Sequence, residues 1–329
     1  MSDLTVRELG PGDESTWRCL YSASAQHLGL MWNFCEVVAG GIGRAVRLGA
    51  FRRDQLIAGM VFVERRVRGF RVWRHPSPAP FAGLLHACGS ASESYLRDVL
   101  AAFGAFIAAS TPMAEVIFHS QLQDLRGLLW NGWGAQPRYN YVSEIAEEGA
   151  LAKAAENSVR RQAAKARNAR FLLHPLDHSP DLLIQLWDAT RKRQGIPEWI
   201  PPANLRNLAR MLPSPSSTDR PTPPCDGGLF GIGLSPQTIE AGMLFGADPQ
   251  RVYYLIGAAA LEEGEKGTGA PTLLHIAFTD EIFRRRGPFL YDWCGANTPS
   301  VAQFKKKFRP RLEVTMQAVW KAPWARFLL

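Results

Sequence analysis

The segment from Tyr291 to Phe308, YDWCGANTPSVAQFKKKF, constrains the fold of this chain more than any other stretch. The apolar residues before it predict a short strand that ends at Asp292, and the Gly-Ala-Asn sequence that follows predicts a turn. A short helix is then expected, because Phe304 and Phe308 are four residues apart and share one helical face. Binding sites of α/β folds commonly form just beyond strand ends, so the segment places cations where such a site is expected.

Three consecutive lysines, Lys305, Lys306 and Lys307, lie between the two aromatic residues of that helix. Successive residues of a helix point in different directions, so the three lysines cannot all serve a core. Flexible cations beyond a strand end favour an anion site. The alternative is an amphipathic helix whose lysine face is solvated.

The chain has 329 residues, which is enough for about two domains with sizeable cores. Its first residues, MSDLTVRELGPGDE, are polar and acidic, so no secretory signal is predicted. The longest uncharged run, residues 99–114, is shorter than the roughly 20 residues that a membrane-spanning helix needs. The five cysteines are scattered and have no CxxC spacing. These features predict a cytoplasmic protein with reduced thiols and no integral membrane segment.

The formal net charge of +8 is unevenly distributed along the chain. Residues 1–149 hold 14 Lys and Arg against 14 Asp and Glu, whereas residues 150–329 hold 24 against 16. A basic half favours a polyanionic partner such as tRNA, a nucleotide, CoA or an anionic membrane surface. Composition alone does not choose among these partners.

The chain is expected to divide near Gly149 into an N-terminal domain of residues 1–149 and a C-terminal domain of residues 150–329. Both halves combine strand patterns with helical segments. In the second half, helices are expected over Leu151–Ala169 and from Pro271 to a stop at Gly287. Residues 213–228, PSPSSTDRPTPPCDGG, predict an exposed, mobile loop because they are rich in proline and serine.

Several common chemistries have no signature in the sequence. There is no HExxH, CxxC, GxSxG or P-loop motif, so neither a metal site nor a resident cofactor is predicted. The seven histidines are isolated, and His275 lies on an otherwise apolar helix, where a satisfied core residue is expected.

A glycine-rich segment, GEKGTGAP, precedes the helix that starts at Pro271. Backbone N–H groups of such a loop and the following helix N-terminus can hold a pyrophosphate. Gly267 and Gly269 fit this arrangement and form a possible CoA loop. The alternative is a flexible entry to the helix, which would have the same composition.

A second basic segment, SVRRQAAKARNAR, begins at Ser158. On a helix, Arg161 and Lys165 are one turn apart, and Arg160 lies next to this stripe. Such cations suit a nucleic-acid backbone, although a solvated helix face is an equally good interpretation. Aromatic residues of this half either line a substrate groove or belong to the core; they are Trp187, Trp199 and Tyr253.

Four segments in this order resemble the FemAB-type transferases, which belong to the wider GNAT-like acyltransferases. They are HPSPAPFAGLL, similar to the family's Pro-rich strand leading to a Gly; QLQDLRGLLWNGWGAQPRYNYV; the basic segment from Ser158; and YDWCGANTPSVAQFKKKF. The resemblance covers roughly Gln26 to Trp320. It implies an α/β (α+β) protein with two tandem GNAT-like domains, each a mixed sheet flanked by helices.

The resemblance also implies a function, namely acyl transfer that forms an amide bond. The family takes an amino acid from aminoacyl-tRNA and passes it to the amine of a peptide or small molecule, in cell-wall or natural-product biosynthesis. Lys305 occupies the family's Phe-Lys position and is expected to stabilise the oxyanion, with Asp292 as a candidate general base. Phe304 and Asn297 are expected to contact substrate. Residues expected to bind the donor tRNA are Arg160, Arg161, Lys165 and Lys306.

The chain departs from the family pattern after Phe308, where Arg309 and Pro310 replace a small residue. It also has Gly264 where a CoA loop would begin with Gln or Arg. Two alternatives to tRNA-dependent transfer therefore stay open. One is an acetyl-CoA-dependent GNAT N-acetyltransferase, and the other is a non-catalytic RNA-binding module.

Overall fold

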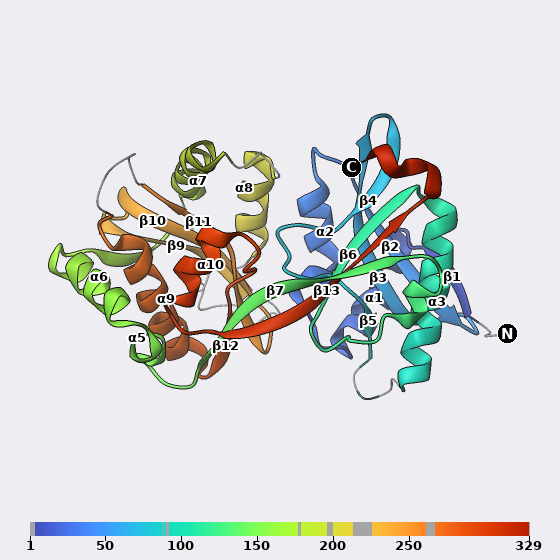
Figure 1. Cartoon of the computed structure of the whole chain (residues 1–329), viewed down its shortest axis with the longest axis horizontal. Coiled ribbons are helices and arrows are strands. Elements are labelled where there is room, and N and C mark those ends of the chain that lie inside the picture. Colours follow the sequence, from blue (N-terminus) through green and yellow to red (C-terminus); the bar gives the residue numbers. More distant parts are fainter. Residues whose placement is uncertain are drawn as a thin grey trace. The chain divides into compact units, whose positions relative to one another are not determined.

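The structure, a computed structural model, describes residues 4–87, 89, 92–176, 179–195, 200–212, 226–260 and 267–328. The chain forms two compact units (Figure 1). Unit 1 comprises Met1–Arg138 and Val314–Leu329, and unit 2 comprises Tyr139–Glu313. These bounds differ from the predicted division near Gly149, because the last strand of the chain returns to unit 1 and pairs there with Met113–Phe118.

Unit 1 is a mixed sheet with helices. Its strands follow the order β1-β2-β3-β4-β6-β13, with β4 and β6 parallel and the other neighbours antiparallel. The core combines apolar residues of β2, β3 and β6 with one face of α3. The elements are β1 (Leu4–Glu8), η1 (Pro11–Asp13), α1 (Glu14–Ser22), η2 (Leu28–Leu30), α2 (Trp32–Ala39), β2 (Arg44–Arg52), β3 (Gln55–Val67), β4 (Phe70–Arg74), β5 (Leu85–His86), α3 (Glu93–Ser110), β6 (Met113–Phe118), α4 (Arg126–Leu129), the first part of β7 (Gly134–Ile145), most of β13 (Arg311–Lys321) and η3 (Pro323–Leu328).

Unit 2 is a second mixed sheet with helices. Its strands follow the order β7-β12-β11-β10-β9-β8, in which only the neighbours β11 and β12 are parallel among the described strands. The elements besides β7 are α5 (Ala150–Ala154), α6 (Asn157–Asn168), β8 (Leu172–Pro175), α7 (Pro180–Gln194), α8 (Pro202–Met211), β9 (Asp226–Ser235), β10 (Thr238–Ala247), β11 (Arg251–Ala259), α9 (Ala270–Arg286), β12 (Phe289–Asp292) and α10 (Pro299–Lys306).

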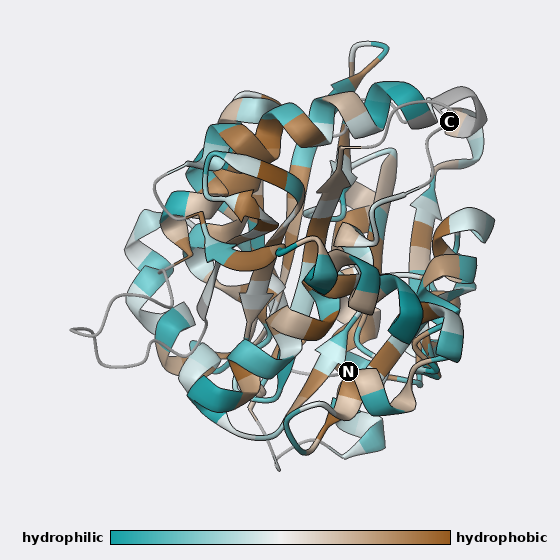
Figure 2. Ribbon diagram, turned by 90° about the vertical axis from the view of Figure 1, so that its left-hand side faces the viewer, coloured by the Kyte–Doolittle hydropathy of each residue, from teal (hydrophilic) through white to brown (hydrophobic). Residues whose placement is uncertain are grey.

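Helices cover both faces of the sheet in unit 2. Met243 and Phe245 of β10 pack with α9 in one apolar cluster, whereas Gly242, which points to the opposite face, lies against Leu183 of α7. The helices carry both hydrophilic and hydrophobic residues (Figure 2). The α/β fold class predicted from the sequence is confirmed.

Most predicted elements are present, and helix α9 ends at Gly287, whose φ of 76° is left-handed. Three expectations need correction. The helix expected over Leu151–Ala169 is two helices, because the extended Glu156 between them donates its N–H to the oxygen of Lys307 (2.9 Å). The Pro-rich strand expected after His75 is mostly irregular, and only Leu85–His86 pair as β5.

The third correction concerns the predicted loop of residues 213–228. Residues 213–225 lie outside the described part of the chain, and β9 already begins at Asp226. In the ranges that the structure describes, no helix is both long and apolar enough to cross a bilayer.

Candidate active site

The parallel strands β11 and β12 of unit 2 differ in length, and β12 ends beside the third residue of β11. Tyr253 pairs with Asp292, the last residue of β12, and β11 then continues to Ala259 paired, among the described strands, only with β10 on its other side. The turn after β12 and helix α10 lie beyond this point. Ligands of α/β folds bind outside the carboxyl ends of parallel strands, so this end of β12 is the expected place for a site.

Asp292 anchors the end of β12. Its side chain is fully buried, and one carboxylate oxygen accepts from Asn140 Nδ2 and from the N–H of Cys294, both at 2.8 Å. The other oxygen accepts from Arg251 Nη1 at 3.0 Å. Burial raises the pKa of Asp292, although Arg251 opposes this change. Both oxygens are thus engaged, and Asp292 is a structural residue rather than an accessible general base.

Arg251 connects Asp292 to a second carboxylate. It donates to Glu313 at 2.9 and 3.1 Å through its two Nη atoms, and all three side chains are buried. This network joins the start of β11 to the end of β12 and the start of β13. Such a network fixes one arrangement of the strand ends, because a buried charge without its partner is costly.

The turn after β12 is held against β7. The N–H of Trp293 donates to Tyr141 O (2.9 Å), and the N–H of Gly295 donates to Asn140 Oδ1 (2.7 Å). Asn297 exchanges two hydrogen bonds with the backbone of Tyr139, each 3.0 Å long. Asn297 is exposed, but its amide serves the turn, so a substrate-binding role is not evident from its position.

Lys305 points from α10 into this turn. Its Nζ donates to the backbone oxygens of Trp293 and, at 2.8 Å, Gly295. The side chain is only 5% exposed, and burial lowers the pKa of Lys305 to about 8, with Cys294 and Asp292 acting in the opposite direction. The prediction of three flexible cations is therefore wrong for Lys305, which is buried and held in place. Lys306 and Lys307 are exposed.

An aromatic ring lies beside Lys305, and further rings pack against that ring. Its Nζ lies 5.6 Å from the centre of the Tyr254 ring on β11. His275 of α9 packs against Tyr254 (4.6 Å between ring centres) and against Phe304 (5.7 Å). His275 Nδ1 bonds to the hydroxyl of Tyr291 (2.8 Å), and burial lowers the pKa of His275 to about 3. The expectation that His275 is a satisfied core residue agrees with these contacts.

The basic residues predicted to bind tRNA have different environments. Helix α6 begins at the end of α10, since the N–H of Glu156 bonds to Lys307 O. Lys306, Arg161 and Lys165 are exposed on these adjoining helices. Arg160 instead caps α5, because its guanidinium donates to Ala155 O (2.7 Å). The structure thus brings three predicted cations to one end of unit 2.

The possible CoA loop lies against the same basic helix. A Cβ at Gly269 would collide with the backbone oxygen of Gln162 in α6, and Lys165 Nζ lies 3.4 Å from Gly267 O. Thr272 also bonds to Gln162 (3.1 Å). Gly269, with a φ of 84°, therefore serves close packing between α6 and the start of α9. That packing explains the glycine without a pyrophosphate.

The aromatic groove predicted from the sequence is not assembled as expected. Tyr253 is fully buried, and its hydroxyl donates to Asp248, so it is a core residue. Trp187 is half-buried on α7, one turn before Thr190, which bonds to Ala259 at the end of β11. Trp199 lies outside the described residues.

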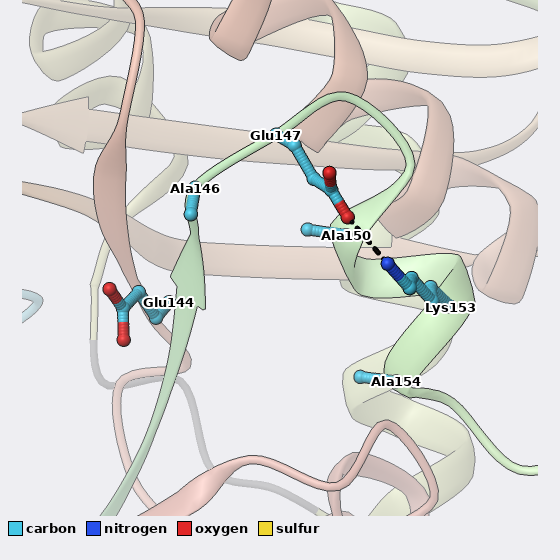
Figure 3. Close-up of a pocket in the computed structure, with 6 residues that line it drawn as sticks. All are labelled: Glu144, Ala146, Glu147, Ala150, Lys153 and Ala154. Carbon is cyan, nitrogen blue, oxygen red and sulfur yellow. Dashed lines mark hydrogen bonds and ion pairs between the residues drawn. The ribbon is translucent and has the colours of Figure 1, made fainter.

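Separate cavities open elsewhere in unit 2. One of about 500 Å³ lies between the end of β7 and α5 and includes the ion pair of Glu147 with Lys153 at 2.9 Å (Figure 3). Another of about 400 Å³ is lined by Arg167 of α6 and by α9 residues. Neither contains Lys305. Within the described ranges, no group of His, Cys, Asp or Glu could hold a metal ion.

Sequence reasoning missed the residues that hold Lys305 and the strand ends. Asn140 and Arg251 resemble ordinary strand residues, and Glu313 is one acidic residue near a basic run. Tyr254 is adjacent to the predicted Tyr253, but it lies on the opposite face of β11. Successive residues of a strand face opposite sides of the sheet, so Tyr253 and Tyr254 cannot both face the apolar cluster, and Tyr254 is the one that does.

No protein-family model matches this sequence, and no curated protein matches it. Solved structures are similar over nearly the whole chain. FemX is 12% identical with a TM-score of 0.69, covering 97% of this chain and 98% of FemX. L-PGS from Bacillus licheniformis is 11% identical with a TM-score of 0.57, covering 98% and 96%. A tandem GNAT protein from the clavulanic acid biosynthesis pathway is 11% identical with a TM-score of 0.53, covering 96% and 98%.

At these identities the likeness concerns the fold. The two mixed sheets with their helices correspond to the tandem GNAT-like arrangement implied by the four sequence motifs. The resemblance inferred from the sequence is thereby confirmed: this chain has a FemX-like, tandem GNAT-like fold.

Proposed function

We propose that this protein is an acyltransferase that forms an amide bond at the end of β12. The observation that carries the proposal is the buried Lys305 ammonium, held by two backbone carbonyls of the turn that follows β12. A lysine removed from water in this way is costly, and such groups concentrate at functional sites.

The buried lysine suits stabilisation of an oxyanion. Two of its three N–H groups donate to Trp293 and Gly295, which leaves the third for the oxygen of a bound acyl group. With a pKa of about 8, Lys305 is mostly protonated at neutral pH. Its attraction to the acyl oxygen would strengthen as the carbonyl becomes tetrahedral and that oxygen gains negative charge, and an interaction that is stronger in the transition state lowers the barrier.

The reaction needs no covalent enzyme intermediate, because the donor is already activated. The neutral amine of the acceptor attacks the acyl carbon, and a C–N bond replaces the C–O bond of an ester or the C–S bond of a thioester. The amine loses one proton, and the leaving oxygen or sulfur gains one. Asp292 is too buried and too fully engaged to accept that proton, so we assign it a positioning role only.

We favour aminoacyl-tRNA as the donor. The exposed cations lie on α6 and α10, and these two helices meet where the N–H of Glu156 bonds to Lys307 O. Such a surface suits a phosphate backbone. The packing role of Gly269 weakens the case for CoA at the start of α9. The sequence resemblance to the FemAB-type transferases supports the same donor.

The acceptor we propose is the amine of a peptide or of a small molecule in cell-wall or natural-product biosynthesis. This assignment rests on the family resemblance. A tRNA-dependent reaction places the protein in the cytoplasm, where charged tRNA is made.

The test is to incubate the protein with a charged tRNA pool and, in parallel, with acetyl-CoA, each with amine acceptors. We expect protein-dependent discharge of tRNA, and its loss in Lys305→Ala but not in Lys307→Ala. Discharge of acetyl-CoA alone would identify the N-acetyltransferase alternative. Binding of tRNA without turnover of either donor would identify a non-catalytic RNA-binding module.

A further inference from the structure

The hairpin of β3 and β4 in unit 1 ends in an exposed tip that the proposed acyl transfer does not use. Arg68 and Gly69 form a two-residue turn with φ angles of 50° and 86°. Both angles are left-handed, as hairpin turns of this length favour. The strand register places Val67 opposite Phe70 and Arg66 opposite Arg71. Arg66, Arg68, Phe70 and Arg71 are all exposed.

Phe70 forms an exposed aromatic pair with Trp324 of η3. Phe70 is 38% exposed and Trp324 is 56% exposed, and their ring centres are 5.4 Å apart at an angle of 53°. Figure 1 shows the C-terminal segment beside this hairpin. The pair lies next to a small apolar cluster that includes Val72 and Ala325. An isolated exposed apolar residue needs no explanation, whereas two large aromatic residues in contact suggest an interaction site.

The charge around this pair is strongly positive. The run from Glu64 to Arg74 contains five arginines and one glutamate, although residues 1–149 as a whole hold 14 cations and 14 anions. Glu64 is itself occupied, since it bonds to Arg44 at 3.2 Å and lies 4.0 Å from Arg71. Lys321 at the end of β13 adds a further, half-buried cation. Exposed arginines therefore lie on the same hairpin as the exposed ring of Phe70.

We propose that the tip formed by Arg66, Arg68, Phe70, Arg71 and Trp324 docks on a membrane surface that contains anionic phospholipids. Tryptophan and phenylalanine are favourable at the level of lipid headgroups, and arginines beside them attract anionic lipid. The contact is peripheral. It is independent of the acyl transfer proposed above.

The aromatic geometry favours lipid over nucleic acid. A base stacks on the open, flat face of a ring. Phe70 and Trp324 are tilted against each other, so each partly covers its neighbour and together they form one wedge. A wedge ringed by arginines fits a headgroup layer better than a single strand of RNA.

The test is co-sedimentation with vesicles of phosphatidylglycerol mixed with phosphatidylcholine, compared with vesicles of phosphatidylcholine alone. We expect the protein to bind only the anionic vesicles, less strongly at high salt. Arg66→Gln with Arg68→Asn should weaken this binding roughly tenfold, since each cation near an anionic surface contributes measurably. Asn tolerates the left-handed backbone at residue 68. Phe70→Ser with Trp324→Ser should weaken binding at every salt concentration.

A matched control is available in the same unit. The turn between β2 and β3, Arg53-Asp54, has φ angles of 48° and 65° and also follows an exposed arginine, Arg52. Arg52→Gln with Arg53→Asn removes the same charge from the same kind of turn and should leave vesicle binding unchanged. Melting temperatures establish that each variant is folded.

Three results would overturn the proposal. The first is equal binding of anionic vesicles by the wild type and by the charge variant of the tip. The second is equal loss in the control variant, which would indicate a general effect of net charge. The third is loss of single-stranded RNA binding, with vesicle binding retained, in the tip variants, which would assign the surface to nucleic acid.

Discussion

Lys305 and Lys306 are neighbours on one short helix, yet they belong to two different regions of unit 2. Lys305 lies in a buried cluster in which each polar group has a fixed partner, from Asp292 with Arg251 to the carbonyls of the turn. Lys306 lies on the exposed surface of α10 and α6, with Arg161 and Lys165. Burial fixes the position and alters the acidity of a charge, whereas exposure leaves it mobile and screened by salt. The first region therefore suits chemistry, and the second suits attraction of a polyanion.

The largest expected effect is on stability and comes from the buried cluster. Asp292→Ala leaves donors of Asn140, Cys294 and Arg251 without their acceptor, and removing one partner of a buried pair costs about 3–5 kcal/mol. Urea unfolding measures this change. Lys153→Ala, which breaks the exposed pair with Glu147, should produce no measurable loss. A loss at Asp292 of less than about 1 kcal/mol would contradict the structural role assigned to it.

The next effect is on turnover. Lys305→Ala should lower kcat by roughly 10²-fold, the typical cost of one lost oxyanion donor. Lys306→Ala and Lys307→Ala should change kcat little, because both side chains are exposed. The measurement is single-turnover transfer with saturating donor. Equal losses in all three variants would show that the two regions do not differ in function.

The pH dependence should separate chemistry from folding. Since the pKa of Lys305 is lowered to about 8, its ammonium is lost as the pH rises through 8, and kcat should fall about tenfold per pH unit above that value. The unfolded chain keeps this proton up to a higher pH, so the contribution of Lys305 to stability rises over the same interval. A falling rate without falling stability is thus expected. Lys306→Ala should show the same descending limb, and a rate that is flat up to pH 10 would refute the assignment.

The smallest effect concerns donor affinity. Replacing Arg161, Lys165 and Lys306 with Glu should raise the donor KM by about tenfold and flatten its salt dependence, with kcat nearly unchanged. The matched control replaces Lys192, Arg206 and Arg210 of α7 and α8 with Glu, which changes the net charge equally. Steady-state kinetics at several salt concentrations measure both. If the control variant loses as much donor affinity, the donor is attracted by the overall charge of the protein and not by the surface of α6 and α10.

Much of the local structure was accessible from residue patterns. The start of α9 follows from Pro271, and its end follows from Gly287, because both residues act on the backbone at their own positions. The strand that ends at Asp292 and the turn after it were predicted for the same reason. The break before α6 was not predictable, since it depends on a hydrogen bond between Glu156 and Lys307, far apart in the chain.

The position of the candidate site in the chain was predicted, but the burial and the partners of its residues were not. The sequence located Lys305 and Asp292, yet it presented Asp292 as a possible base and Lys305 as a flexible cation rather than a buried one. Asn140 and Arg251 decide otherwise, because they bond to Asp292 from two other strands, and Glu313 of a third strand holds Arg251. Similarly, the sequence presented Gly269 as part of a phosphate loop. Only the structure shows that the backbone oxygen of Gln162 occupies the space that a side chain at residue 269 would need.

The sequence by itself determined the α/β class, the ends of the helices that carry proline or glycine signals, and the strand, turn and lysine-bearing helix around Asp292. These features depend on the dihedral preferences and periodicity of consecutive residues. Only the tertiary structure decided which lysine is buried, which charges are paired, and that β13 returns to unit 1 and pairs with β6. Those outcomes depend on contacts between residues distant in the chain, where the desolvation of a charge and the hydrogen bonds that offset it are set by neighbours that no local pattern identifies.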